Sequence, residues 1–140
     1  MELLEKERTL TELDCARITI LLRRARRDKS TWSQDLPASK LRDFAMVVPP
    51  REVPQDVVTM YSKVVVRHLA SDRRSTLTLC YPPDDNPDAG FVSVLSPAGW
   101  SLLGLSIGAV ARWPGPAGEE NAVEIEEVLF QPESSGDYSM

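Results

Sequence analysis

The sequence predicts an α+β protein: a short N-terminal antiparallel helical hairpin, followed by an antiparallel β-sheet domain that contains one short helix. Three observations predict it. Apolar residues recur at helical spacing before residue 49 and alternate with polar residues in the second half of the chain. Pro49-Pro50 marks the change of period, and Ser96-Pro97 opens a long uncharged run. We therefore expect the hairpin and a linker in residues 1–53 and the sheet domain in residues 54–140.

The first helix is expected from Thr11, which can cap it, to about Arg27. Its apolar residues form two flanks of a wide arc: Ile18, Leu21, Leu22 and Ala25 on one flank, and Leu13, Ala16 and Ile20 on the other. So wide an arc predicts contacts with two neighbours. The arginine cluster Arg23–Arg27 has two interpretations that stay open, because it can complement the helix dipole or contact an acidic partner.

The second helix is expected to start at Pro37, which suits the first position of a helix, and to end before Pro49-Pro50. Its apolar residues step at i, i+3, i+4 and i+7: Leu41, Phe44, Ala45 and Val48. Because the intervening loop is short, the two helices should pack as an antiparallel hairpin. With about 16 residues at 1.5 Å each, the hairpin would reach roughly 25 Å.

Alternating residues predict five strands, near residues 63–67, 76–81, 91–95, 109–113 and 122–131. The short helix should be capped by Ser96, begin at Pro97 and stop at Gly104.

The last strand contains a conflict of parity. Val123 and Ile125 share one face, whereas Val128 and Phe130 share the other. A β-bulge near Glu126 would let both pairs face the core.

Charge is unevenly distributed along the chain. Residues 1–53 hold 11 Lys/Arg and 9 Asp/Glu (net +2), and residues 54–140 hold 5 and 12 (net −7), which sum to −5. An acidic sheet domain argues against direct nucleic-acid binding. Cys15 and Cys80 have no metal or redox spacing, the charged N-terminus is unlike a signal peptide, and no apolar run can span a bilayer. We expect a cytoplasmic protein without membrane contact.

Residues typical of catalysis are not combined into any known motif. The sequence has no Ser-His-Asp set, no Cys/His metal cluster and no Gly-rich phosphate loop, and its single histidine, His68, lies within a predicted strand. Asp84-Asp85 and Glu126-Glu127 are expected to be solvated surface charge. We therefore expect no enzymatic activity, no cofactor and no metal.

Several stretches resemble the GreA/GreB family of bacterial transcript-cleavage factors. Ser96-Pro97, the short helix and Leu102-Leu103-Gly104 look like the C-terminal domain of that family. Residues 13–18, 53–60 and 131–138 are similar to its branch of regulators of nucleoside diphosphate kinase. The resemblance covers residues 10–138 and implies that the sheet domain has the fold of FK506-binding proteins.

The resemblance also implies a function. In GreA and GreB this domain docks on RNA polymerase beside the secondary channel, and a long coiled coil carries an Asp-x-x-Glu tip to the Mg²⁺ that cuts the transcript. Here the predicted hairpin is shorter, and its tip, with Asp28, Trp32 and Asp35, lacks that pair. The implied function is a regulator that occupies the docking site, competes with GreA/GreB-type factors and does not stimulate cleavage. The family motif places the polymerase contact at Ser96, Pro97, Ala98 and Gly99.

Two alternatives stay open. One is a short-armed cleavage factor. The other is a prolyl isomerase, which the implied fold permits but the aromatic content disfavours: the chain has 3 Trp, 3 Tyr and 3 Phe, and Trp32, Tyr61 and Tyr138 lie outside the expected sheet core. No residue supports a direct site for nucleoside diphosphate kinase.

Overall fold

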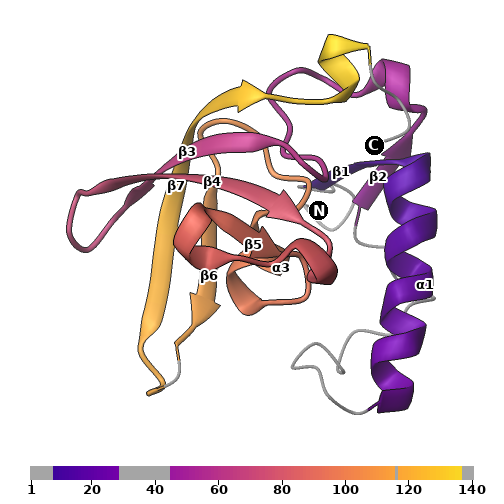
Figure 1. The fold of residues 1–140 in the computed structure, drawn as a ribbon. Coiled ribbons are helices and arrows are strands. Elements are labelled where there is room, and N and C mark those ends of the chain that lie inside the picture. The colour runs from indigo at the N-terminus through magenta and orange to yellow at the C-terminus, as the bar shows by residue number, and fades with distance from the viewer. Residues whose placement is uncertain (1–7, 29–44, 116, 137–140) are drawn as a thin grey trace, which may run out of the picture.

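The fold is that of a computed structural model, which describes residues 8–28, 45–115 and 117–136, the first of these ranges with side chains only to Arg24. Its centre is a curled five-stranded sheet with the strand order β5-β4-β3-β7-β6 (Figure 1). The strands are β3 (Lys63–His68), β4 (Arg74–Cys80), β5 (Phe91–Ser93), β6 (Val110–Pro114) and β7 (Glu120–Phe130). The short helix α3 (Pro97–Leu102) packs against β5 and β6, and the longer helix α1 (Glu12–Asp28) stands beside the sheet.

Both described α-helices begin where the capping residues predict. The hydroxyl of Thr11 accepts a hydrogen bond from the backbone N–H of Asp14, 3.0 Å away, at the start of α1. Ser96 caps α3, and Gly104 follows this helix with a left-handed φ of 81°. The predicted positions of these two helices are therefore confirmed.

The predicted N-terminal helical hairpin is wrong. Ala45–Val48, expected to end its second helix, form strand β2, which pairs in parallel with β1 (Arg8–Thr11). The last two residues of β2 are β-branched valines followed by Pro49, and a residue before proline is displaced from the helical region toward extended conformations. The first residue of β2 is buried and Met46 is exposed, which is the alternation of a strand. The rest of the expected second helix lies outside the described residues.

The sheet is mixed, whereas an antiparallel sheet was predicted. β3 pairs antiparallel with β4 and β7, and β6 pairs antiparallel with β7, but β5 runs parallel to β4. The Pro-rich connection, with the 3₁₀ turns η5 (Pro82–Asp84) and η6 (Pro87–Ala89), brings the chain back so that Phe91 lies beside Thr78. A loop of this length permits a parallel return that a tight hairpin turn does not.

The predicted β-bulge is present at Glu126. Val65 lies opposite Glu127 and Val66 opposite Ile125, so Glu126 is an extra residue in β7. The side chain of Glu126 points to arginines of β3 and β4, with its carboxylate oxygens 3.2 Å from Arg67 Nε and 2.6 Å from Arg74 Nε.

A second shift occurs at Leu129, because Val64 pairs with Val128 and Lys63 with Phe130. The expectation that Phe130 faces the core is therefore wrong, since this second extra residue returns it to the side of exposed Lys63. Phe130 is 40% exposed.

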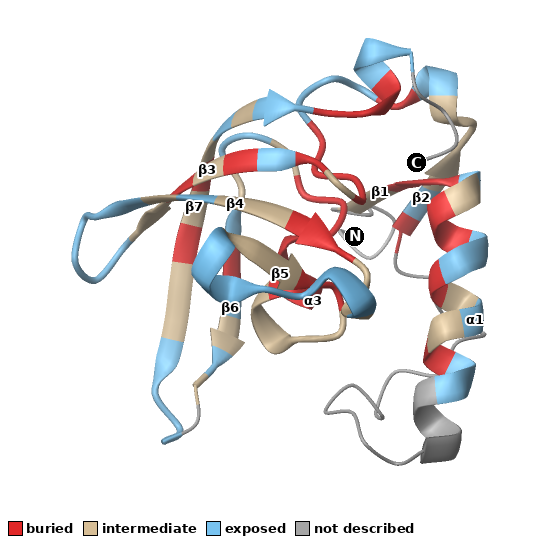
Figure 2. Ribbon diagram, in the orientation of Figure 1, coloured by how far each residue is buried: buried red, intermediate tan, exposed pale blue. Residues whose placement is uncertain are grey.

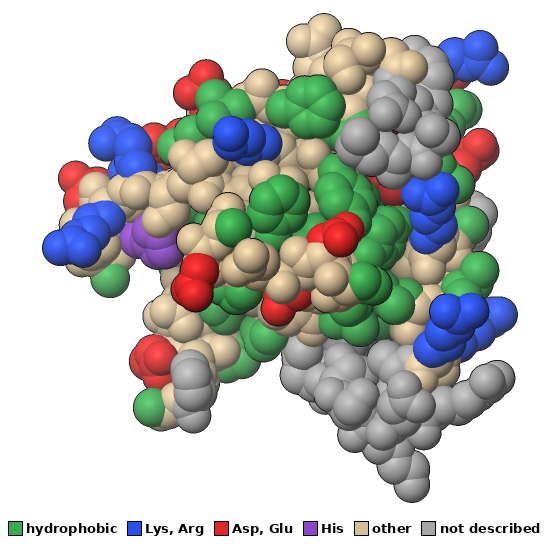
Figure 3. Space-filling model, in the orientation of Figure 1, with side chains coloured by type: hydrophobic (Ala, Val, Ile, Leu, Met, Phe, Trp, Pro, Cys, Tyr) green, Lys and Arg blue, Asp and Glu red, His purple; other side chains and the backbone are tan. Residues whose placement is uncertain are grey.

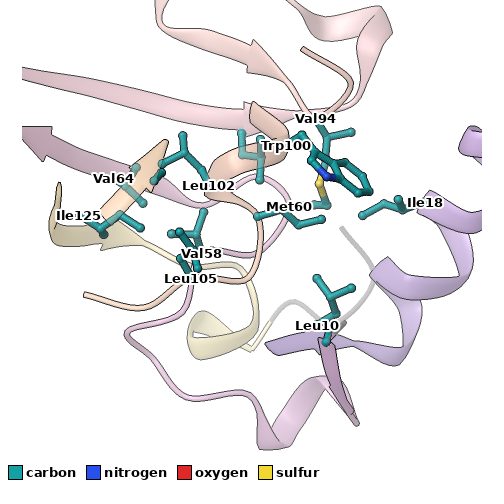
Figure 4. Close-up of a cluster of buried hydrophobic side chains, with 14 of the residues drawn as sticks. Leu10, Ile18, Val58, Met60, Val64, Val94, Trp100, Leu102, Leu105 and Ile125 are labelled. Carbon is teal, nitrogen blue, oxygen red and sulfur yellow. The ribbon is translucent and has the colours of Figure 1, made fainter. Parts of the chain in front are cut away.

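The core lies between the sheet, α3 and the inner face of α1 (Figure 2). Figure 4 shows the side chain of Trp100 between Val94 and Ile18, with Met60 below it. Ile18 in α1 is fully buried. Helix α1 thus shares one hydrophobic core with the sheet.

The N-terminal strand is fixed to the end of α3. Arg8 Nη1 donates hydrogen bonds to the carbonyl oxygens of Trp100 (2.9 Å) and Leu103 (2.7 Å), and Thr9 N donates to Gly104 O (2.9 Å). A Cβ on Gly104 would lie 3.0 Å from Arg8 Cβ, so glycine allows the close approach as well as the positive φ. Among the described helices, none is long and apolar enough to cross a membrane.

Candidate docking site

The turn that leads into α3 is built by serine side chains. Ser96 Oγ accepts a hydrogen bond from Gly99 N (3.0 Å) and donates one to Ser93 O (2.7 Å). Ser93 Oγ accepts from Leu95 N at 3.0 Å. We call the segment Ser93–Gly99 the docking turn, since it contains the four residues that the family motif singles out.

The four motif residues have different surroundings. Gly99 is buried, and a Cβ on it would lie 2.0 Å from the carbonyl oxygen of Ser93, which no side chain can occupy. Ser96 and Gly99 therefore build the turn. Pro97 and Ala98 are partly exposed, so these two can meet a partner. The prediction that all four contact polymerase stays a prediction.

A neighbouring loop supports the docking turn. Asp85 Oδ1 accepts a hydrogen bond from Ser93 N at 3.0 Å, and Asp84 accepts one from the hydroxyl of Tyr61. Both aspartates are exposed, as expected, but each is also a hydrogen-bond partner of the fold. The pKa of Tyr61 is raised to about 12 by burial and by this bond to Asp84, so its hydroxyl keeps its proton.

The other three segments that resemble the family, residues 13–18, 53–60 and 131–138, meet at and beside the turn Thr59–Ser62. Asp14 Oδ2 accepts a hydrogen bond from Met60 N (3.2 Å), and Thr59 Oγ1 donates to Glu133 Oε1 (2.7 Å). Gln131 Nε2 donates to Pro54 O and Val57 O, at 2.8 Å each. These blocks join α1, the turn and the C-terminal segment, so they build the fold. The sequence analysis did not predict that these segments join distant parts of the fold. Their wide separation along the chain was the available signal.

Asp14 is the most perturbed carboxylate of this junction. Its pKa is raised from 3.8 to about 7, chiefly by burial; the hydrogen bond from Met60 opposes this rise and nearby Glu133 adds to it. Its second oxygen, Oδ1, is buried without a hydrogen-bond partner in the described part of the chain.

The described residues offer little for catalysis. They contain no group of three His, Cys, Asp or Glu side chains that could hold a metal ion. His68 Nε2 lies 3.0 Å from Ser75 Oγ within the sheet, and both cysteines are buried as free thiols. Of the three expected tip residues, Asp28 ends α1 with its side chain undescribed, and Trp32 and Asp35 lie outside the described residues.

Comparisons with known proteins agree with this geometry. The family model "Transcription elongation factor, GreA/GreB, C-term" matches residues 53–130, which include the docking turn. The "Regulator of nucleoside diphosphate kinase" of Escherichia coli K12 is 36% identical over 129 residues, covering 92% of this chain and 93% of that protein. The "Transcription elongation factor GreA" of Nautilia profundicola is 29% identical over 93 residues, covering 66% of this chain and 57% of that protein.

A solved structure extends the likeness to the fold. The "Prokaryotic transcription elongation factor GreA/GreB from Nitrosomonas europaea" has 37% sequence identity and a TM-score of 0.71, covering 88% of this chain and 99% of that chain. The predicted resemblance is thereby confirmed. By sequence over more than half of its length, and by fold, this chain belongs to the GreA/GreB family of transcription elongation factors.

Proposed function

We propose that this chain binds RNA polymerase through the docking turn, excludes GreA/GreB-type factors from the shared site and does not stimulate transcript cleavage. Family membership supports a transcription regulator that resembles elongation factors. The proposal adds the docking residues, the competition and the missing cleavage activity.

The short reach of α1 is the observation that carries the proposal. α1 has 17 residues, which at 1.5 Å each extend about 25 Å. The chain is back beside the start of α1 by Ala45, because β2 pairs with β1, the strand that precedes this helix. If the docking turn meets polymerase as in GreB, a helix of this length is well short of a catalytic Mg²⁺ deep in the channel.

The sequence that follows α1 supports the same conclusion. Asp28 and Asp35 are separated by seven positions, with Lys29 beside the first, and the sequence holds no Asp-x-x-Glu at this place. A hard divalent cation needs converging oxygen ligands, and a nearby ammonium group opposes its binding. Binding without this chemistry makes the protein a competitor.

The test uses stalled elongation complexes. Binding to core RNA polymerase is measured first, by co-purification, because a protein that does not bind would also fail to stimulate cleavage. Transcript cleavage is then followed with this protein alone, with GreB alone, and with GreB plus increasing amounts of this protein. We expect binding, no cleavage by this protein alone, and suppression of GreB-dependent cleavage that additional GreB relieves by mass action. Cleavage by this protein alone that is lost in Asp28→Asn would establish a short-armed cleavage factor instead.

A further inference from the structure

A groove of about 320 Å³ separates α1 from the Pro-rich turn η5. On the α1 side the described lining residues are Arg17, Ile20, Leu21 and Arg24. The opposite wall consists of Tyr81 and the two prolines that follow it. In Figure 3, hydrophobic side chains occupy the middle of the visible face, and Lys and Arg side chains gather over α1 at its edge.

The groove contains Ile20, the large apolar side chain that the core leaves exposed in the described part of α1. Ile18 and Leu22 are buried against the sheet domain, at 0% and 1% exposure, whereas Ile20 is 52% exposed. The four α1 residues of the groove are spaced i, i+3, i+4 and i+7, so they form one stripe along the helix. The described part of α1 already contacts β1, β2 and the core, and Ile20 lies outside these contacts at the groove.

The far wall selects an apolar occupant. Proline has no backbone N–H, so Pro82 and Pro83 present no donor, and their rings keep the wall rigid. The hydroxyl of Tyr81 is buried, and burial raises its pKa, so this residue brings no negative charge to the groove. A volume of about 320 Å³ is near the lower limit for ligand pockets and suits one or two large side chains.

The charges of the groove select an acidic occupant. Arg24 is exposed and makes no ion pair with any residue that the structure describes. Arg17, seven positions earlier, lies near Asp14 and Tyr81 at the other end of the stripe, about 10 Å along the helix axis. Residues 54–140 carry a net charge of −7, from 5 basic and 12 acidic residues, so an acidic partner is repelled by most of the molecule and attracted here.

We propose that this groove binds an acidic amphipathic helix of a protein partner. The partner helix would insert two adjacent apolar side chains between Ile20 and the Tyr81 wall, and would place a carboxylate near each arginine. Such a helix carries its acidic residues at i and i+7 and its apolar residues at i+3 and i+4, which matches the stripe on α1. This surface is separate from the docking turn, and the proposal goes beyond the proposed function.

The test uses two fluorescein-labelled synthetic helical peptides and the full chain. The first peptide has Glu at positions 1 and 8, Leu at positions 4 and 5, and Ala or Gln elsewhere; the second has Lys in place of both Glu. Fluorescence anisotropy should show binding of the acidic peptide that weakens with added salt. Arg24→Glu should weaken it at least about tenfold and create binding of the Lys peptide, since charge complementarity sets specificity.

The matched control is Arg23→Glu, an exposed neighbour that does not line the groove, which should change affinity for either peptide less than about twofold. Ile20→Ser should also reduce binding at least about fivefold, with an unchanged circular-dichroism melting curve. Equal losses in Arg23→Glu and Arg24→Glu, or no loss in Ile20→Ser, would overturn the proposal. So would the absence of acidic-peptide binding at millimolar concentration. Self-association of the free chain that Ile20→Ser abolishes would assign this face to a second copy and reject the acidic helix.

Discussion

The carboxylate of Asp14, in the first turn of α1, accepts a hydrogen bond from the backbone N–H of Met60, 3.2 Å away and 46 positions later in the sequence. This bond fixes the start of α1 to the turn Thr59–Ser62. The same turn is bonded to Glu133 through Thr59, so one buried polar junction joins three distant parts of the chain.

Asp14→Asn should remove a pH dependence of stability. The folded-state pKa of Asp14 is about 7, against an ordinary 3.8, so the folded protein binds the proton more tightly than the unfolded chain. The stability from this proton is fully present below about pH 4 and is lost as the pH rises through 7. Urea unfolding at pH 4, 5.5, 7 and 8 should show wild type losing roughly 2–4 kcal/mol relative to Asp14→Asn over this range.

The informative quantity is how the difference in free energy of unfolding between wild type and Asp14→Asn changes with pH. Its absolute size is not informative, because the new amide also leaves one buried polar group unpaired at every pH. Asp56→Asn, the same substitution at an exposed residue, should follow wild type. A difference between wild type and Asp14→Asn that stays constant from pH 4 to pH 8 would contradict the prediction.

Gly99→Ala should destabilise the protein strongly. The added Cβ would lie 2.0 Å from the carbonyl oxygen of Ser93, and backbone cannot move aside as a flexible side chain can. We expect a loss of about 3 kcal/mol or more in the free energy of unfolding, measured by denaturant titration. Gly108→Ala is the control, since its φ is 94° but no atom lies within 4 Å of the new Cβ; it should lose only about 1–2 kcal/mol from strain. Similar losses in the two variants would show that steric contact is not what requires Gly99.

Gln131→Glu should disrupt the C-terminal part of the junction. The amide of Gln131 donates to two carbonyl oxygens, Pro54 O and Val57 O, and a carboxylate of the same shape has no N–H to offer them. The result is a buried negative charge facing two acceptors, with an expected cost of about 3 kcal/mol at pH 8. The cost should fall at acidic pH, where the new carboxyl group is protonated and can donate once.

Gln55→Glu provides the matched control for that experiment, because Gln55 is exposed. Thermal unfolding of both variants at pH 5 and pH 8 separates the effect of a buried carboxylate from that of an exposed one. A melting temperature of Gln131→Glu equal to that of Gln55→Glu at pH 8 would mean that the two carbonyl contacts contribute nothing.

Ala98→Glu should weaken polymerase binding without unfolding the docking turn. Ala98 is partly exposed in the first turn of α3, where a negative charge is favourable to the helix dipole, so the melting temperature should stay close to wild type. A bulky charge at the proposed contact should raise the Kd for core RNA polymerase at least about tenfold. Ala70→Glu, in the exposed turn after β3, should leave the Kd unchanged. Loss of binding that parallels loss of stability would mean that the turn only builds the fold.

Local rules in the sequence determined several features of this protein. Thr11 and Ser96-Pro97 start the two helices because a hydroxyl cap and a proline satisfy the first helical turn without help from distant residues. Gly104 follows the end of α3 because glycine adopts the left-handed φ of 81° found there without steric cost. The bulge at Glu126 also follows from sequence, because the change of parity between Ile125 and Val128 requires an extra residue wherever both face one core.

Tertiary structure decided the rest. Ala45–Val48 fits a helical period as well as a strand, and pairing with β1 chose the strand. The direction of β5 depends on where the connection after η5 returns, and the exposure of Phe130 depends on a second shift at Leu129. Residue spacing could not show that Asp14 would meet Met60, or that Ile20 would face a groove. Spacing along a chain specifies which side of an element a residue occupies, whereas the packing of distant elements decides what that side meets.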